Sequence, residues 1–118
     1  MLKSKIHRAT VTDSALHYEG SLTLDENLMK AADILPFEHV HVYNITNGHR
    51  FETYVIRGEE SSGIICVNGA AAHLARKGDL VIIASYGLTE GLKLKSYKPK
   101  LVFVDGNNKV IRKVAQKD

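Results

Sequence analysis

The sequence predicts one mainly β domain that closes, or nearly closes, into a barrel with one or two short helices. The chain has 118 residues, which is the size of an ordinary single domain. About seven or eight short segments are β-branched, fully apolar or alternately apolar and polar, and turn signals separate them. One clear helical pattern lies among these segments. A parallel sheet flanked by helices would need more helices than that, so a barrel is the better prediction.

The N-terminal third is predicted to hold a strand and the clear helix. Lys3–Thr12 is rich in β-branched residues and is predicted to be a strand. The pair Gly20-Ser21 follows within the segment His17–Leu24. Asp25 is a good N-cap for a helix that runs through Leu35 and ends at Pro36. Its apolar stripe would consist of Leu28, Met29, Ala32 and Leu35.

The middle of the chain is predicted to form a hairpin and a buried strand. His39–Thr46 and Phe51–Arg57 both alternate, and Asn47-Gly48 lies between them. Asn-Gly favours a type I′ turn, in which both central residues have positive φ. Glu59–Gly63 is predicted to be a loop, and the fully apolar Ile64–Val67 a short central strand.

The C-terminal half is predicted to be strands with one small helical segment. Asn68-Gly69 is a second turn signal, and Ala70–Leu74 after it has the pattern of one or two helical turns. Asp105-Gly106 is predicted to turn the last two strands back on each other. The further predicted strands are Leu80–Tyr86, Gly91–Tyr97, Leu101–Asp105 and Lys109–Val114.

Composition limits the classes of protein that remain. The single cysteine excludes an internal disulfide framework and a multi-thiolate metal site. We expect a reducing, cytoplasmic location, because the first eight residues contain no apolar run and no stretch approaches about 18 apolar residues. A chain this small has little room for a deep cleft. An enzyme of this size is predicted to need a prosthetic group or a site shared between subunits.

The net charge of +3 raises an alternative function, a small basic β-barrel that binds nucleic acid. The basic residues of the last third alternate with apolar ones, which is typical of the solvated face of strands. The chain has no Trp, three Phe and five Tyr, and lacks a basic-aromatic cluster suited to base stacking. A net positive field would equally attract small anionic substrates. We therefore expect no nucleic-acid partner.

Several side chains are candidates for chemistry, each with an ordinary structural explanation beside it. His39 and His41 share one face of a strand, but no third or fourth ligand lies nearby in sequence, so no metal site is predicted. Cys66 is expected to be a small buried apolar residue. Arg50 and Tyr54 also share a face. An arginine fork suits a carboxylate, and a tyrosine hydroxyl can deliver a proton.

Gly20-Ser21 can support self-processing chemistry, although the pair is also common in turns. The Ser21 hydroxyl could attack the carbonyl carbon of Gly20, and an N→O acyl shift would replace the peptide bond by an ester. Elimination would split the ester and leave dehydroalanine. Hydrolysis of dehydroalanine would then leave a pyruvoyl group at residue 21, an electrophile that ordinary side chains do not provide.

Six motifs together carry a family resemblance. They occur in one order along residues 1–105: Lys5-x-His7-Arg8; His17-Tyr18-Glu19-Gly20-Ser21; Asn44-x-Thr46-Asn47-Gly48-x-Arg50-Phe51 with Thr53-Tyr54; Val67-Asn68-Gly69-Ala70-Ala71-Ala72-His73; and Gly78-Asp79-x-Val81-Ile82-Ile83-Ala84-Ser85. In this order they closely resemble the bacterial aspartate α-decarboxylase family, pyruvoyl enzymes that make β-alanine for pantothenate synthesis. Residues 87–118 carry little of the resemblance.

The resemblance implies a fold, an assembly and a processing event. The fold would be a six-stranded double-psi β-barrel, and the assembly a homotetramer with sites at subunit boundaries. Self-cleavage between Gly20 and Ser21 would give a β chain, residues 1–20, and an α chain, residues 21–118. The involvement of a separate maturation factor stays open.

The resemblance also implies residue roles. Ser21 would become the pyruvoyl group and form a Schiff base with the amine of L-aspartate, and Tyr54 would donate a proton after CO₂ leaves. Thr53 would hydrogen-bond the Gly20 carbonyl during maturation, an oxyanion-type role. The implied substrate-binding residues are Lys5, Arg50, Thr53, Asn68, Gly69, Ala70 and Ala71, with Arg50, assisted by Lys5, on a substrate carboxylate. The pocket would be lined by His7, Tyr18 and Tyr43, the last at a position where some relatives carry Trp.

Overall fold

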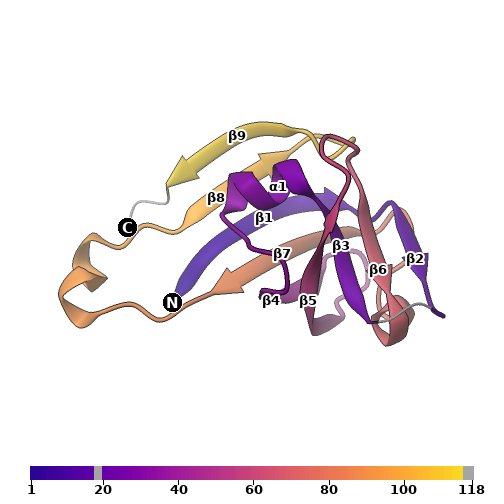
Figure 1. The fold of residues 1–118 in the computed structure, drawn as a ribbon, viewed down its shortest axis with the longest axis horizontal. Coiled ribbons are helices and arrows are strands. Elements are labelled where there is room, and N and C mark those ends of the chain that lie inside the picture. Colours follow the sequence, from indigo (N-terminus) through magenta and orange to yellow (C-terminus); the bar gives the residue numbers. More distant parts are fainter. Residues whose placement is uncertain (18–19, 116–118) are drawn as a thin grey trace.

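Nine strands and three short helices make up the described part of the chain (Figure 1). The computed structural model describes residues 1–17 and 20–115. The strands are β1 (Leu2–Thr10), β2 (Asp13–Ala15), β3 (Ser21–Asp25), β4 (His39–Asn44), β5 (Arg50–Gly58), β6 (Ile65–Asn68), β7 (Leu80–Tyr86), β8 (Lys100–Val104) and β9 (Val110–Ala115). The helices are α1 (Glu26–Ala32) and the 3₁₀ segments η1 (Gly69–His73) and η2 (Gly91–Ser96).

The strands form one curved sheet in the order β2-β6-β3-β5-β4-β7-β1-β8-β9. Three neighbouring pairs are parallel, namely β1 with β8, β2 with β6 and β3 with β5, and the other pairs are antiparallel. The predicted mainly β, barrel-like fold is confirmed. The predicted count of six strands is not, because the described part of the chain has nine strands and the order ends at β2 and β9.

The core lies on the concave face of this sheet and is apolar throughout. Alternation along the strands places Leu22 and Leu24 of β3, Val55 of β5 and Val67 of β6 inside, all fully buried. Ser21 and Asn68 therefore take the opposite face of their strands. This alternation decides which side chains can reach the site described below.

Helix α1 begins where predicted and ends earlier. The Asp25 carboxylate accepts a hydrogen bond from the Asn27 amide at 2.8 Å, which confirms the N-cap. The helix ends at Ala32 because Asp33 takes a left-handed conformation with φ 55°. The Ile34 amide then donates to the Met29 carbonyl, and Ile34 is buried. Leu35, the predicted fourth member of the apolar stripe, is instead 66% exposed.

The β4–β5 hairpin forms as predicted, but its turn is not type I′. Gly48 has φ 80°, whereas Asn47 has no positive φ, and residues 45–49 make a longer loop. The reason is Asn44, whose buried side chain accepts hydrogen bonds from the Thr46 and Asn47 amides. This side-chain cap gives the loop an alternative to the two-residue turn.

The prediction of a strand over Gly91–Tyr97 is wrong. Residues Gly91–Ser96 form η2, which lies on an extension that projects beyond the sheet (orange in Figure 1). Leu92 is 98% exposed and Leu94 is 44% exposed, so no partner strand covers the alternating pattern within the described chain. The predicted helical segment after Asn68-Gly69 is confirmed as η1. None of the described helices is long and apolar enough to cross a membrane.

Candidate active site

Ser21 occupies a buried position at the first residue of β3. Only 1% of it is exposed, and the antiparallel register places it opposite Asn68 of β6. The Asn68 amide nitrogen Nδ2 donates a hydrogen bond to the Ser21 hydroxyl oxygen at 3.1 Å. The hydroxyl is therefore held by a neutral donor in a dry environment, and residue 21 is a serine in this structure.

Asn68 is the centre of a small polar network. Its Nδ2 also donates to Thr23 Oγ1 at 2.9 Å, and its Oδ1 accepts from Cys66 Sγ at 3.1 Å. The four side chains come from two adjacent strands, because Thr23 and Cys66 lie opposite each other as Ser21 and Asn68 do. Burial, and after it the charge of Asp13, raises the pKa of the Cys66 thiol, so the thiol stays protonated as a donor. The hydrogen bonds with Thr23 and Cys66 fix the orientation of the Asn68 amide, so that its nitrogen and not its oxygen faces Ser21.

Gly20 and Thr53 lie beside this position. Leu22 pairs with Val55 in the parallel β3–β5 ladder, so the same register carried back two residues brings Gly20 level with Thr53. Gly20 is exposed, and a Cβ built there would meet no atom within 4 Å among the described residues. Its φ is not in the positive range either. Neither a positive φ nor close packing against the described residues therefore requires glycine at position 20.

Tyr54 and the η1 segment border the same end of β3. Tyr54 directly precedes Val55, the ladder partner of Leu22, so the register carried back one residue brings it level with Ser21. Tyr54 is 38% exposed, and its ring centroid lies 6.4 Å from that of Phe37. Gly69 directly follows Asn68 with φ 71°, a conformation that favours glycine. Ala70 and Ala71 continue into η1, where Ala70 is exposed and Ala71 half-buried. Backbone groups of η1 are thus close in sequence and space to the Ser21–Asn68 pair.

Arg50 is the first residue of β5 and stacks on Tyr43, which in turn contacts Tyr86. Its guanidinium carbon is 4.4 Å from the ring centroid of Tyr43, a cation–π contact. The hydroxyls of Tyr43 and Tyr86 are 2.6 Å apart. Burial, and after it the hydrogen bond with Tyr86, raises the pKa of Tyr43 to about 12. Two surface hollows border both Arg50 and Tyr43, and Ser21 lines neither of them.

Lys5 and His7 lie on β1, four strands from β3 in the sheet order. Lys5 is half-buried and forms no ion pair within the described chain. His7 packs edge-on against Phe103, with ring centroids 5.6 Å apart, and its Nδ1 is buried without a described hydrogen-bond partner. Burial lowers the pKa of His7, and the charges of Lys5 and Arg8 lower it further. Tyr18 lies outside the described residues.

One chain brings together only part of the predicted site. Ser21, Asn68, Thr53 and Tyr54 are on adjacent strands. Arg50 is four residues before Tyr54 along β5, so its backbone lies at least about 13 Å from that of Ser21 at 3.3 Å per residue. That separation exceeds what an arginine side chain spans. A bound substrate would therefore have to bridge the predicted carboxylate-binding group and the predicted reacting serine if both acted from one copy.

Several participants in these contacts were not predicted. Thr23 and Cys66 could have been found, because strand alternation places them on the same face as Ser21 and Asn68. Cys66 is buried as predicted, and it is also a hydrogen-bond donor. Tyr86 carries no such signal, since its contact with Tyr43 depends on the β4–β7 pairing.

The chain resembles known decarboxylases over nearly its whole length. Residues 1–111 match the family model of aspartate decarboxylase. An aspartate 1-decarboxylase of Syntrophus aciditrophicus is 62% identical over 110 residues, which are 93% of this chain and 95% of that protein. An aspartate 1-decarboxylase of Thermoanaerobacter pseudethanolicus is 60% identical over 111 residues, 94% of this chain and 95% of that protein.

The chain folds into a small curved β sheet and has a buried serine that directly follows a glycine. Decarboxylases match it along nearly its whole length, so its class is that of a decarboxylase. Within that class, the chain belongs to the aspartate decarboxylase family.

Proposed function

We propose that this protein decarboxylates L-aspartate to β-alanine and CO₂, after autocatalytic cleavage between Gly20 and Ser21. The observation that carries the proposal is Ser21 itself. It is buried at the start of β3, follows the exposed Gly20, and has its hydroxyl held by Asn68 at 3.1 Å. An ordinary turn serine would face solvent. Membership in the aspartate decarboxylase family supports the choice of substrate.

Maturation would use groups that one chain already brings together. Ser21 Oγ attacks the Gly20 carbonyl carbon, the C–N bond breaks, and an ester forms in place of the peptide. Loss of the Ser21 α-proton then breaks the Cβ–Oγ bond and releases the Gly20 carboxylate. Water finally replaces the nitrogen of dehydroalanine, which leaves as ammonia. Thr53, level with Gly20, is the proposed donor to the carbonyl oxygen on which negative charge develops.

The residues around Ser21 fit a pyruvoyl group. Asn68 Nδ2, which now donates to a hydroxyl oxygen, can donate equally to a carbonyl oxygen at that place. The pyruvoyl group would supply an electron sink for the carbanion that loss of CO₂ creates. Arg50, assisted by Lys5, would hold a carboxylate and so orient the bond that breaks. Tyr54 would deliver the proton, and Gly69, Ala70 and Ala71 would present backbone donors to the substrate.

We propose further that the complete site lies between copies in a homotetramer. Support comes from the separation of at least about 13 Å between Arg50 and Ser21 along one chain. A second support is the amount of apolar surface that one copy leaves uncovered, including Leu88 at 105%, Leu92 at 98% and Phe37 at 76% exposure. A neighbouring copy would then bring Arg50, Tyr43 and Lys5 to the Ser21 end, with His7 and Tyr18 in the pocket wall.

The proposal includes a cytoplasmic role in β-alanine supply for pantothenate synthesis. A single cysteine, buried and hydrogen-bonded, suits a reducing compartment. A maturation factor is a separate question, and it can be tested by incubating the purified chain alone.

Mass spectrometry of the purified, denatured protein tests the processing. We expect two chains divided between Gly20 and Ser21, with the larger one about 17 Da lighter than a hydrolytic fragment would be, because the amino nitrogen is lost. One intact chain after prolonged warm incubation, with or without cell extract, would contradict the proposal.

The variant Ser21→Ala tests the assignment of Ser21 as the nucleophile and as the source of the pyruvoyl group. It should stay folded and uncleaved and have no decarboxylase activity, because the nucleophile is gone. Ser62→Ala, at an exposed loop serine, is the control and should be processed normally. Decarboxylation of aspartate by Ser21→Ala would show that the pyruvoyl assignment is wrong.

A further inference from the structure

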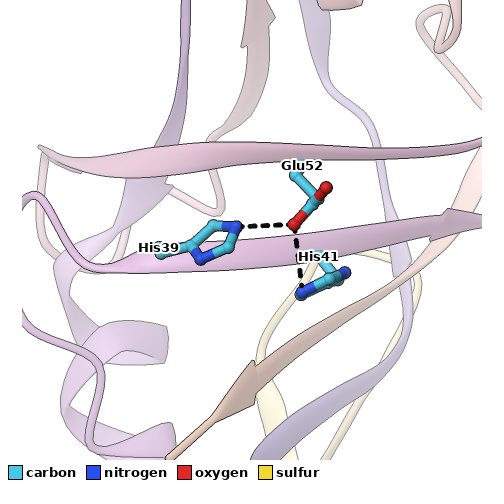
Figure 2. Close-up of side chains that lie close together, drawn as sticks. All are labelled: His39, His41 and Glu52. Carbon is cyan, nitrogen blue, oxygen red and sulfur yellow. Dashed lines mark hydrogen bonds and ion pairs between the residues drawn. The ribbon is translucent and has the colours of Figure 1, made fainter.

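Three side chains of the types that bind metals converge on the outer face of the β4–β5 hairpin. They are His39 and His41 of β4 and Glu52 of β5 (Figure 2). His39 Nε2 lies 2.9 Å from Glu52 Oε1, and His41 Nε2 lies 3.4 Å from the same oxygen. The two imidazoles thus point to one carboxylate oxygen from neighbouring positions.

The strand register explains why the three groups meet. His39 and His41 are two residues apart, so both project from the same face of β4. Glu52 is the direct cross-strand partner of His41, and His39 is one diagonal position away. Cβ atoms of directly opposed residues lie about 4.5–5.5 Å apart, within reach of one shared ion. The paired strands, rather than a flexible loop, hold all three positions.

The donor atoms suit a divalent transition-metal ion. Two imidazole nitrogens and one carboxylate oxygen form a set that zinc uses at sites with an open fourth position. In the protein, the candidate ligand atoms all lie within 4.8 Å of one another. Tetrahedral bonds of about 2.1 Å would place neighbouring ligand atoms roughly 3.4 Å apart. The two imidazole nitrogens lie 2.9 and 3.4 Å from Glu52 Oε1, and the nitrogens would need only a small side-chain adjustment to share an ion.

We propose that His39, His41 and Glu52 form a binding site for a divalent transition-metal ion such as Zn²⁺, with water in the remaining position. The ion would replace the hydrogen bond between His39 and Glu52 and the close approach of His41 to the same carboxylate oxygen. The sequence offered no third ligand near the histidines, and the hairpin supplies one. The cluster is separate from the Ser21–Asn68 pair, although His41 and Glu52 also line one of the hollows beside Arg50. Zinc binding is measured directly, so its outcome does not depend on whether the protein decarboxylates aspartate.

The surroundings permit a bound cation. The side chains of His39 and Glu52 are 65% and 59% exposed, which leaves room for water ligands. The side chain of His41 is 32% exposed and meets the Tyr86 ring edge-on, at a centroid separation of 5.0 Å, which orients its imidazole. Arg50 lies two residues before Glu52 on the same face, but its guanidinium is stacked on Tyr43.

A zinc titration of the untagged, processed protein tests the proposal. Calorimetry at about pH 7.5 should show one zinc bound per chain, and binding should weaken at about pH 5 because imidazole binds metal only when neutral. His41→Asn and Glu52→Gln should each weaken binding at least about 10-fold. His73→Gln, at an exposed histidine of η1 outside the cluster, should bind zinc as the unaltered chain does.

Anomalous diffraction at the zinc absorption edge gives an independent measurement. The expected result is one peak per chain, bonded to His39, His41 and Glu52. The proposal is overturned if no binding is detected up to about 1 mM zinc, the limit of weak association. It is equally overturned if His41→Asn and Glu52→Gln bind as tightly as the unaltered chain. Because the ligands lie at the surface, both variants are expected to fold.

Discussion

Two regions along β5, one beside its middle and one at its first residue, differ in how complete they are. At the first, which we call the Ser21 end, Ser21, Thr23, Cys66 and Asn68 form a closed set of hydrogen bonds within one chain. At the second, the Arg50 end, Arg50, Tyr43 and Tyr86 lie on an open face beside shallow hollows. The contrast supports the proposal that processing uses groups of one copy, whereas substrate binding uses the face of another.

The largest effect that separates the two ends is expected from Arg50→Ala. Loss of a charged contact to a substrate carboxylate costs about 3 kcal/mol, so kcat/KM for aspartate should fall about 100-fold. Cleavage between Gly20 and Ser21 should proceed unchanged. Steady-state kinetics and denaturing electrophoresis measure the two effects. His49→Ala, at the exposed neighbouring residue, should change neither. Blocked cleavage in Arg50→Ala would mean that the two ends are not separate.

Asn68→Ala should have the next largest effect, at the Ser21 end. It leaves the buried hydroxyl of Ser21 and the thiol of Cys66 without their described amide partner, at a cost of about 1–3 kcal/mol in the free energy of unfolding. Cleavage should also slow, because the Ser21 hydroxyl is no longer oriented. Denaturant unfolding and the time course of cleavage measure these effects. Asn107→Ala at an exposed position is the control, and equal behaviour of the two variants would refute the network.

Tyr86→Phe tests the Arg50 end through its pH dependence. Burial and the Tyr86 hydrogen bond raise the pKa of Tyr43 to about 12, above its ordinary value of about 10. A tyrosine with a raised pKa contributes stability that is present below about pH 10 and is lost as the pH rises towards about 12. In Tyr86→Phe the pKa of Tyr43 should move back towards its ordinary value.

Ultraviolet titration of tyrosinate measures this shift. The stability cost of Tyr86→Phe near neutral pH should be about 1 kcal/mol or less, the value of one hydrogen bond. An unchanged Tyr43 titration would show that the Tyr43–Tyr86 contact does not form.

A small effect, of about the same size, is expected from Cys66. Cys66→Ala removes the donor to Asn68 Oδ1 and should cost about 0.5–1.5 kcal/mol, with cleavage slowed a few-fold. Cys66→Ser keeps a donor at the same position and should process faster than Cys66→Ala. The comparison of cleavage rates is the measurement. Equal rates in the two variants would show that the hydrogen bond, as distinct from the volume of the side chain, has no part in orienting Asn68.

Local patterns predicted much of the fold because they depend on near neighbours in sequence. Asp25 caps α1 as predicted, since a cap needs only the amides of the next residues. The predictions for Leu35 and for Gly91–Tyr97 were wrong for a common reason. Each needed a partner from elsewhere in the fold: Ile34 takes the buried place after Asp33, and no described strand pairs with η2.

The same division holds for the candidate site. The order of motifs along the chain identified the family and the Gly20-Ser21 pair, which follow from residue identity alone. The sequence could not show that Cys66 orients Asn68, or that Glu52 meets His39 and His41. Those contacts depend on which strand lies beside which.

The sequence by itself determined the strand-rich class, the helix start, the family and the residue that is proposed to become the prosthetic group. The tertiary structure alone decided that Ser21 is buried opposite Asn68 and that Arg50 stacks on Tyr43. The physical reason is that strand alternation and capping are local, whereas pairing between distant strands depends on how the whole chain closes around one core.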